Sequence, residues 1–426
     1  MTTTTTTAAN PTIQTIARNA REASRLVGDL SEATRNAVLL DLADRIGARQ
    51  GEILAANDAD MAAAEAAGVD APKLKRLKLT PGGLGQLCDG LRQIAALPDP
   101  VGQVTRSYTV PSGLKVEKVR TPLGVIAMIY EARPGVTIDA FALCFKAGNA
   151  CLLKGGKEAD RSNRLLASIA KESLKTHGAP EDAMHAITSS DREELRAMLT
   201  LSDDIDLVIP RGGAGLIRFV HEHSRIPTIQ HFHGVCHVFV DKAADLDEAL
   251  EIVATGKTSS PATCNTTECV LVHRDVADAF VPRLIERAKK DGVTIRGDGH
   301  FVKAAQGAAH VEPATDADWG TEYLDLILAA KVVTSFDDAL AHINRYSSGH
   351  TEAIATTDAT TGEAFCRRVK SSCVLVNAST RFNDGFQLGL GAEIGISTSR
   401  IHAYGPMGLE GLTIERFVVR GAGQTR

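Results

Sequence analysis

Strands and helices alternate along most of this chain, and this alternation restricts the fold more than any other feature. From residue 124 onward we predict a strand at 125–130, a helix at 134–147, a strand at 150–154, a helix at 157–176 and a strand at 206–210. Strands joined by helices form a mostly parallel sheet with both faces covered. The pattern therefore predicts an α/β fold whose ligands lie at the carboxyl ends of the strands.

A second alternating run begins near His237. Its predicted strands are 238–240, 269–272, 323–330, 352–356 and 373–377, with helices between them. At 426 residues the chain is too long for one core, so we predict more than one domain.

Outside these two runs, the first hundred residues read as helices. The helix caps are Ser31 and Thr80. Two strands about a turn are predicted at 104–119, and a last strand at 412–419. Residues 381–411 are rich in glycine and are predicted to form an ordered functional loop.

Composition and charge exclude several functional classes. The net charge is −5 and the basic residues are scattered, which argues against a nucleic-acid partner. No apolar run approaches the length of a membrane span, so no membrane association is predicted. The tract 1–10 has no features of a signal peptide. None of the eight cysteines forms a C-x-x-C pair, which argues against a zinc site and favours reduced thiols in the cytoplasm.

One cysteine, Cys264, stands in a loop rich in Ser, Thr and Pro directly before an apolar run, Cys269 to Val272. A loop anchored by a strand is a common way to expose a nucleophile. Unpaired cysteines are, however, most often buried structural residues, and residue type alone favours that interpretation for both cysteines.

Other polar groups allow weaker hypotheses. The turn Arg211-Gly212-Gly213 could bring backbone N–H groups against a phosphate, although it lacks the G-x-G-x-x-G spacing and an ordinary turn explains it equally well. Lys154 ends a strand and could reach a ribose or phosphate. For His231, His233 and His237, a polar strand end or a cleft lining is favoured over a metal site.

Three long stretches resemble the γ-glutamyl phosphate reductases, a family within the aldehyde dehydrogenase superfamily. They are Pro122 to Ala150, Pro261 to His273 and Val333 to Ile354, and the third is highly specific to this family. Shorter matches surround Pro210, Glu322 and Glu393, so the resemblance runs from about residue 10 to the C-terminus.

The resemblance implies three parts. A Rossmann-type NADPH-binding domain would comprise 1–102 and 121–235, and an α/β catalytic domain 236–404. A small β element, 103–120 with 405–426, would mediate homo-oligomerisation.

The resemblance also implies an oxidoreductase that reduces L-glutamyl 5-phosphate with NADPH. The products would be L-glutamate 5-semialdehyde, NADP and phosphate, in the second step of proline biosynthesis from glutamate. No kinase-like region precedes the match. We therefore expect a free-standing cytoplasmic enzyme that is paired functionally with glutamate 5-kinase.

In this resemblance Cys264 is the nucleophile that carries the acyl group. Its own backbone N–H is the first oxyanion donor, and either Arg133 or Asn265 is the second. Glu322 matches the carboxylate that holds the nicotinamide ribose, and Lys154 or Arg211 would meet the 2′-phosphate, with Gly212 and Gly213 beside them. Arg381, Asn383 and Glu393 are candidates for the substrate's α-carboxylate and α-ammonium groups, or simply parts of the loop. No metal is implied.

One departure from other aldehyde dehydrogenases is informative. Those enzymes carry a Glu, about 34 residues before the cysteine, that activates water for thioester hydrolysis. The region here is Gln230-His231-Phe232-His233, without a carboxylate. The departure favours reduction of an acyl phosphate over aldehyde oxidation. An acylating dehydrogenase using a CoA thioester, and a catalytically silent scaffold, are the alternatives.

Overall fold

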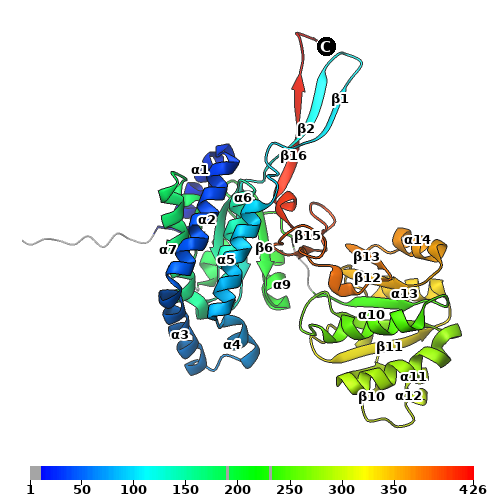
Figure 1. Ribbon diagram of the computed structural model, residues 1–426. Coiled ribbons are helices and arrows are strands. Elements are labelled where there is room, and N and C mark those ends of the chain that lie inside the picture. Colours follow the sequence, from blue (N-terminus) through cyan, green and yellow to red (C-terminus); the bar gives the residue numbers. More distant parts are fainter. Residues whose placement is uncertain (1–10, 189–190, 230–232) are drawn as a thin grey trace, which may run out of the picture. The chain divides into compact units, whose positions relative to one another are not determined.

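A computed structural model describes residues 11–188, 191–229 and 233–426. The tract 1–10 and the segment 230–232, which includes His231, lie outside the described residues. The chain forms two compact units (Figure 1). Unit 1 comprises 1–229, 390–394 and 407–426, and unit 2 comprises 230–389 and 395–406. Each is described below by itself, and the functional boundaries drawn from the resemblance stay a prediction.

Unit 1 contains a parallel sheet in the order β5-β4-β3-β6 and many helices. The strands are β3 (Val125–Tyr130), β4 (Ala150–Lys154), β5 (Met184–Ala186) and β6 (Leu207–Arg211). The helices are α1 (Ile13–Asp29), α2 (Glu32–Ala48), α3 (Gln50–Ala66), α4 (Ala71–Leu77), α5 (Pro81–Ala96), α6 (Gly135–Lys146), α7 (Asp160–Thr176), α8 (Arg192–Met198) and α9 (Ala214–His223), with 3₁₀ turns at Lys157–Ala159, Glu181–Ala183 and Leu409–Leu412.

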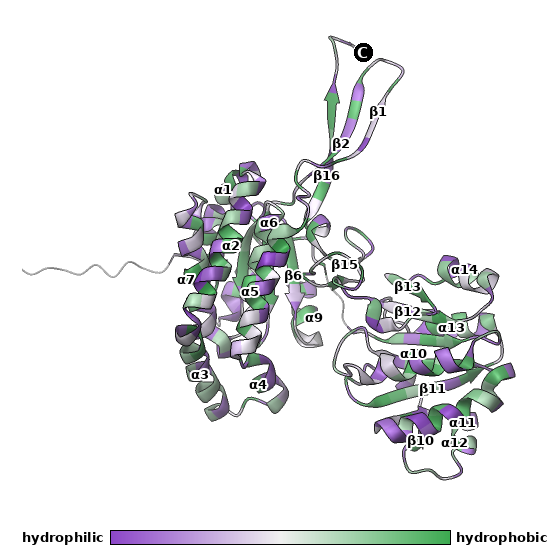
Figure 2. Ribbon diagram, viewed as in Figure 1, coloured by the Kyte–Doolittle hydropathy of each residue, from purple (hydrophilic) through white to green (hydrophobic). Residues whose placement is uncertain are grey.

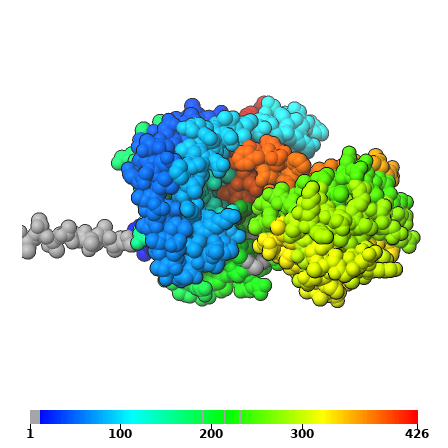
Figure 3. Space-filling model, turned by 60° about the horizontal axis from the view of Figure 1, so that its bottom comes forward, coloured from blue at the N-terminus to red at the C-terminus, as the bar shows by residue number. Residues whose placement is uncertain are grey.

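The predicted helix caps of unit 1 are confirmed. Ser31 Oγ accepts a hydrogen bond from the Thr34 amide at 3.1 Å, and Thr80 Oγ1 accepts one from the Gly83 amide at 3.0 Å. Apolar residues of α1, α8 and α9 pack with those of the sheet in one buried cluster. The N-terminal helices form a closely packed surface, coloured blue in Figure 3.

An antiparallel three-stranded sheet, β1-β2-β16, also belongs to unit 1 and projects from its helices (Figure 1). Its strands are β1 (Val104–Thr109), β2 (Lys115–Pro122) and β16 (Thr413–Arg420). The hairpin and the last strand were both predicted. Every residue of β1 is exposed, and Phe417 and Val419 of β16 expose 61% and 52% of their surface.

Unit 2 is built on a parallel sheet in the order β10-β9-β11-β8-β7-β12-β13. The strands are β7 (Cys236–Val240), β8 (Thr267–His273), β9 (Thr294–Gly297), β10 (Val311–Pro313), β11 (Ile327–Val333), β12 (Thr351–Ala355) and β13 (Cys373–Val376), and a separate pair is formed by β14 (Ile396–Ser397) and β15 (Gly405–Pro406). The helices are α10 (Leu246–Thr258), α11 (Arg274–Asp291), α12 (Gly299–Ala304), α13 (Phe336–Tyr346) and α14 (Ala359–Arg368), with 3₁₀ turns at Asp318–Gly320 and Thr380–Phe382.

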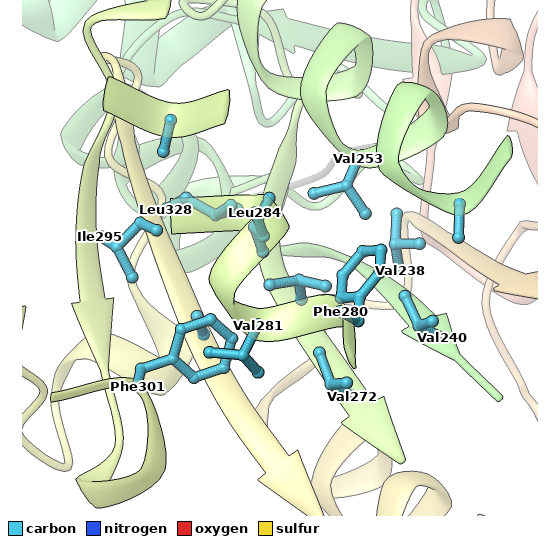
Figure 4. Close-up of a cluster of buried hydrophobic side chains, with 14 of the residues drawn as sticks. Val238, Val240, Val253, Val272, Phe280, Val281, Leu284, Ile295, Phe301 and Leu328 are labelled. Atoms are coloured by element: carbon cyan, nitrogen blue, oxygen red, sulfur yellow. The ribbon is translucent and has the colours of Figure 1, made fainter. Parts of the chain in front are cut away.

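Alternate residues of β8 enter different cores. Val270 and Val272 join the cluster formed with α10, α11 and α12, whose side chains point toward one another in Figure 4. Cys269 and Leu271 join the cluster that includes residues of α13 and α14. Helices on both faces of each sheet carry a mixture of hydrophobic and hydrophilic residues (Figure 2), as expected of amphipathic helices that cover a core. The predicted α/β fold is confirmed.

Two details of the sequence-based prediction are wrong. The strand predicted at 323–330 begins only at Ile327, because Leu324 has a φ of +54° and its segment turns away from extended geometry. His237 is the second residue of β7, but it is fully buried in the core and lines no cleft.

Candidate active site

The turn between α10 and β8 presents Cys264, which is partly exposed. The hydroxyls of Thr263 and Thr266 both donate to the carbonyl of Ser260, at 2.9 and 2.6 Å. A third bond links the Thr266 amide to the Thr263 carbonyl at 3.1 Å. The Ser/Thr composition that made this loop recognisable therefore closes it into a fixed turn.

The backbone of Cys264 is held by Gly234, which lies just before β7, and by Cys236, the first residue of β7. The Cys236 thiol donates to the Cys264 carbonyl oxygen at 3.3 Å, and burial raises the pKa of Cys236, which keeps its proton in place. The Cα of Gly234 packs against the same carbonyl so closely that a Cβ would overlap it. Only glycine fits at 234, and this constraint was not recognised from sequence.

Asn265 supports the turn. Its amide nitrogen donates to the backbone carbonyls of Arg381 and Asn383, at 3.3 and 3.1 Å, and its amide oxygen lies 3.1 Å from the Thr263 hydroxyl oxygen. The side chain is 4% exposed. Both amide hydrogens are used within the protein, so in this structure Asn265 has none left for an oxyanion.

The glycine-rich region contributes directly to this turn. Arg381 donates from Nη1 to Thr263 Oγ1 at 2.6 Å. Asn383 is fully buried, and its amide donates to Thr351 Oγ1 at 2.8 Å, so its side chain serves the architecture of the loop. Arg381 is only partly buried and remains the better placed of the two for a ligand, while Glu393 lies in unit 1.

Glu322 is half-buried, and its Oε1 accepts a hydrogen bond from the Gly234 amide at 2.9 Å. Burial raises the pKa of Glu322, and the Gly234 N–H opposes that shift. Gly234 thus touches both the carboxylate expected to hold a ribose and the backbone of the expected nucleophile. The structure brings Cys264, Asn265 and Glu322 together in unit 2.

A buried ion pair lies beside Glu322 and was also missed. Lys257 Nζ of α10 is 2.7 Å from Glu268 Oε2 of β8, and the two side chains are 1% and 0% exposed. Glu268 Oε1 accepts from the Leu324 amide at 3.4 Å, and Lys257 lies over the Tyr323 ring. Both partners therefore brace the segment that carries Glu322. No local periodicity links Lys257 to Glu268, so the sequence gives no signal for the pair.

The other predicted residues lie in unit 1, at the carboxyl edge of its parallel sheet. Lys154 and Arg211 end the strands on either side of β3, since Lys154 pairs with Ile129 and Arg211 with Tyr130. Lys154 is 9% exposed, and burial lowers its pKa. Two cations at one edge suit an anionic ligand, as the rule for parallel sheets predicts. Cys264 does not follow the rule that ligands lie at the carboxyl ends of the strands, because it lies before the amino end of β8.

The turn after β6 is occupied by a carboxylate. The Gly213 amide donates to Glu131 Oε2 at 3.2 Å, and a Cβ on Gly212 would lie 2.8 Å from the Glu131 carboxyl carbon. Packing against Glu131 explains the glycine at 212. Phosphate binding by Gly212 and Gly213 stays a prediction without support from this contact. Arg133 is exposed, next to Ala132, whose φ is +37° and whose amide donates to Glu158.

Known proteins are similar to this chain over nearly its whole length. The pattern of the family described as "Aldehyde dehydrogenase family" matches residues 1–312. A γ-glutamyl phosphate reductase of Xanthomonas campestris pv. campestris (strain 8004) is 50% identical over 417 residues, covering 97% of this chain and all of the relative. The corresponding protein of Xylella fastidiosa (strain M23) is 51% identical over 414 residues, 97% of each chain. The crystal structure of the γ-glutamyl phosphate reductase of Thermotoga maritima matches with a TM-score of 0.95 at 40% identity, covering 98% of this chain and 100% of that one.

The chain belongs to the γ-glutamyl phosphate reductases, within the aldehyde dehydrogenase family. As in that family, a nicotinamide cofactor is used. None of this reductase's eight cysteines, all of which lie in the described part of the chain, forms a disulfide. Among the described residues, no helix combines the length and apolar character that crossing a bilayer requires.

Proposed function

We propose that this chain reduces L-glutamyl 5-phosphate with NADPH to L-glutamate 5-semialdehyde, releasing phosphate, in the second step of proline biosynthesis. The observation that carries the proposal is the fixed turn that exposes Cys264, in a chain that is 50% identical to a γ-glutamyl phosphate reductase over 97% of its length. In the first step the Cys264 thiolate attacks the γ-carbonyl carbon. A C–S bond forms, the C–O bond to phosphate breaks, and a thioacyl enzyme remains.

NADPH, when bound, supplies the hydride that reduces the thioacyl carbon. The chain's own part is to hold the thiohemiacetal oxygen while it is negative and then to release the aldehyde and the Cys264 thiol. The Cys264 backbone N–H is the first oxyanion donor. Because both amide hydrogens of Asn265 are engaged with backbone carbonyls, we assign the second donor to Arg133 and a positioning role to Asn265.

The charges of the predicted residues suit the cofactor. Lys154 and Arg211, at one sheet edge of unit 1, would meet the 2′-phosphate. Glu322, fixed by the Gly234 amide, would accept from the nicotinamide ribose. The carboxylate that activates water in other members is missing at Gln230 to His233, so the thioacyl enzyme is protected from hydrolysis.

Three further properties belong to the same proposal. The enzyme would be a cytoplasmic homo-oligomer that assembles through the β1-β2-β16 sheet, because apolar residues such as Phe417 and Val419 are exposed there. A functional pairing with glutamate 5-kinase would deliver the acyl phosphate, which is readily lost to water.

One assay tests the proposal. The protein is mixed with glutamate 5-semialdehyde, NADP and phosphate, and NADPH formation is followed. We expect phosphate-dependent turnover that vanishes in Cys264→Ala and persists in Cys366→Ala, a change at an exposed cysteine of α14. Turnover that requires CoA in place of phosphate would replace this function with that of an acylating dehydrogenase. A folded protein without turnover in either assay would indicate a silent scaffold.

A further inference from the structure

A second cluster of reactive side chains lies in unit 2, inside the core beneath α13. It consists of His237 on β7, Cys269 on β8 and His342 on α13. One ring nitrogen of each histidine and the Cys269 sulfur all lie within 4.8 Å of one another. The three residues are 0%, 1% and 4% exposed. The mechanism above uses none of them.

The separations suit a shared ion. Cys269 Sγ is 3.8 Å from His342 Nε2. An ion about 2.3 Å from the sulfur and about 2.0–2.1 Å from the nitrogen would join these two atoms at an angle of about 120°, within the range of zinc–thiolate–imidazole sites. His237 Nε2 is buried and has no hydrogen-bond partner among the described residues. A buried imidazole nitrogen without a partner needs an explanation, and a bound cation supplies one.

His237 is oriented as metal-binding histidines are. Its Nδ1 lies 3.0 Å from Glu352 Oε2, which also accepts from the His237 backbone amide at 2.9 Å. Glu352 is fully buried and is held on its other oxygen by the hydroxyls of Ser347 and Ser371. A carboxylate that receives Nδ1–H fixes the ring and leaves Nε2 to the ligand, the arrangement found behind many zinc-bound histidines.

The surrounding charges are few. Lys331 Nζ is 3.5 Å from His342 Nδ1, and the ring of His342 also contacts Trp319 and Tyr346. A metal on Nε2 would leave a proton on Nδ1, and the partly exposed Lys331 would then have to turn toward solvent.

We propose that His237, Cys269 and His342 bind a thiophilic divalent cation, with zinc as the best match to one thiolate and two imidazoles. Binding releases the Cys269 thiol proton, and the ion links β7, β8 and α13. Spacing along the sequence gives no sign of this site, because its three residues come from three separate elements. The site shares no residue with the proposed catalytic machinery, and its occupancy is independent of the proposed function.

The test is a metal analysis of the full chain. The protein is unfolded with a chelator, refolded with zinc or without added metal, dialysed, and analysed by plasma mass spectrometry. We expect one zinc ion per refolded chain, and a higher melting temperature with zinc than without it. Refolding with Co²⁺ should give the near-ultraviolet thiolate-to-cobalt absorption band.

Matched variants locate the ion. Cys269→Ser should lose the cobalt–thiolate band and most of the zinc, whereas Cys366→Ser should keep both. Lys331→Gln offers an acceptor to His342 Nδ1–H and should bind zinc more tightly than the wild type. Wild-type protein that refolds fully without retaining zinc or cobalt would overturn the proposal, and so would a cobalt–thiolate band that survives in folded Cys269→Ser. In either case the cluster would be a hydrogen-bonded part of the core.

Discussion

Cys264 and Cys269 belong to the same short stretch of sequence, but the structure places them in different surroundings. Cys264 stands in a turn before β8, partly exposed, with its backbone carbonyl held by Cys236 and packed on Gly234. Cys269 lies within β8, 1% exposed, facing two histidines. The difference shows that a thiol's role here depends on whether it lies before the strand or inside it. The turn leaves the Cys264 thiol partly exposed, whereas the strand buries that of Cys269.

The largest effect should come from removing the thiol of the turn. Cys264→Ala should lower turnover by about 10⁴-fold or more, as removal of a nucleophile does in other enzymes. Steady-state rates of NADPH formation measure the change, with Cys366→Ala as the matched control at an exposed cysteine. Comparable losses in both variants would show that cysteine removal acts through folding.

The buried ion pair between Lys257 and Glu268 of β8 should matter chiefly for stability. In Lys257→Met the Glu268 carboxylate is left buried without its partner, which costs about 3–5 kcal/mol in the free energy of unfolding. Urea denaturation measures this loss in the free energy of unfolding. The double variant Lys257→Met/Glu268→Leu should recover most of the loss.

A surface pair provides the control for that experiment. Arg368 and Asp337 are largely exposed in the same unit, and Arg368→Met should change stability by no more than about 1 kcal/mol. Equal effects of Lys257→Met and Arg368→Met would contradict the distinction between the buried and the exposed pair.

Gly234→Ala tests the link between the turn and Glu322. The added methyl group must displace the Cys264 carbonyl, so we expect turnover to fall by about 10–100-fold, in keeping with the cost of a small misplacement of a reacting group. Alkylation of Cys264 by iodoacetamide should change in rate as well. Gly299→Ala, where a Cβ meets nothing within 4 Å, is the control and should behave as the wild type does.

The smallest of these effects concerns the cofactor. Glu322→Gln keeps an acceptor for the Gly234 amide and removes only the charge, so the KM for NADPH should rise about tenfold with a smaller change in kcat. Initial rates at varied NADPH give both constants. An unchanged KM together with a large loss of kcat would place Glu322 in the chemistry and not in cofactor binding.

Sequence patterns predicted the long elements well and the short ones poorly. Strands such as β3 and helices such as α5 follow from uninterrupted apolar runs and from caps such as Thr80. The short elements β5, α8, β9, α12 and β10 were missed, because they contain too few residues to show a period. Tyr323 and Leu324 read as part of the strand in the sequence, but Leu324 has a φ of +54° and its amide donates to Glu268, so the strand starts later.

The residues of the candidate site also fall into those that the sequence predicted and those that it did not. Cys264 and Glu322 were predicted through motifs that are continuous in sequence. Gly234, Cys236 and Lys257 were missed, because their contacts join segments that lie far apart along the chain. The partners of Asn265 are backbone carbonyls of the glycine-rich region, and no sequence pattern distinguishes such a supporting amide from an oxyanion donor.

In the proposed reaction Cys264 carries the acyl group, and hydride transfer, not water, removes it. The direct test is to incubate the enzyme with glutamate 5-semialdehyde and NADP without phosphate, quench with acid, and map adducts by peptide mass spectrometry. We expect a γ-glutamyl thioester on the peptide containing Cys264, which disappears when phosphate is added. An adduct on another residue, or steady release of free glutamate without phosphate, would contradict it.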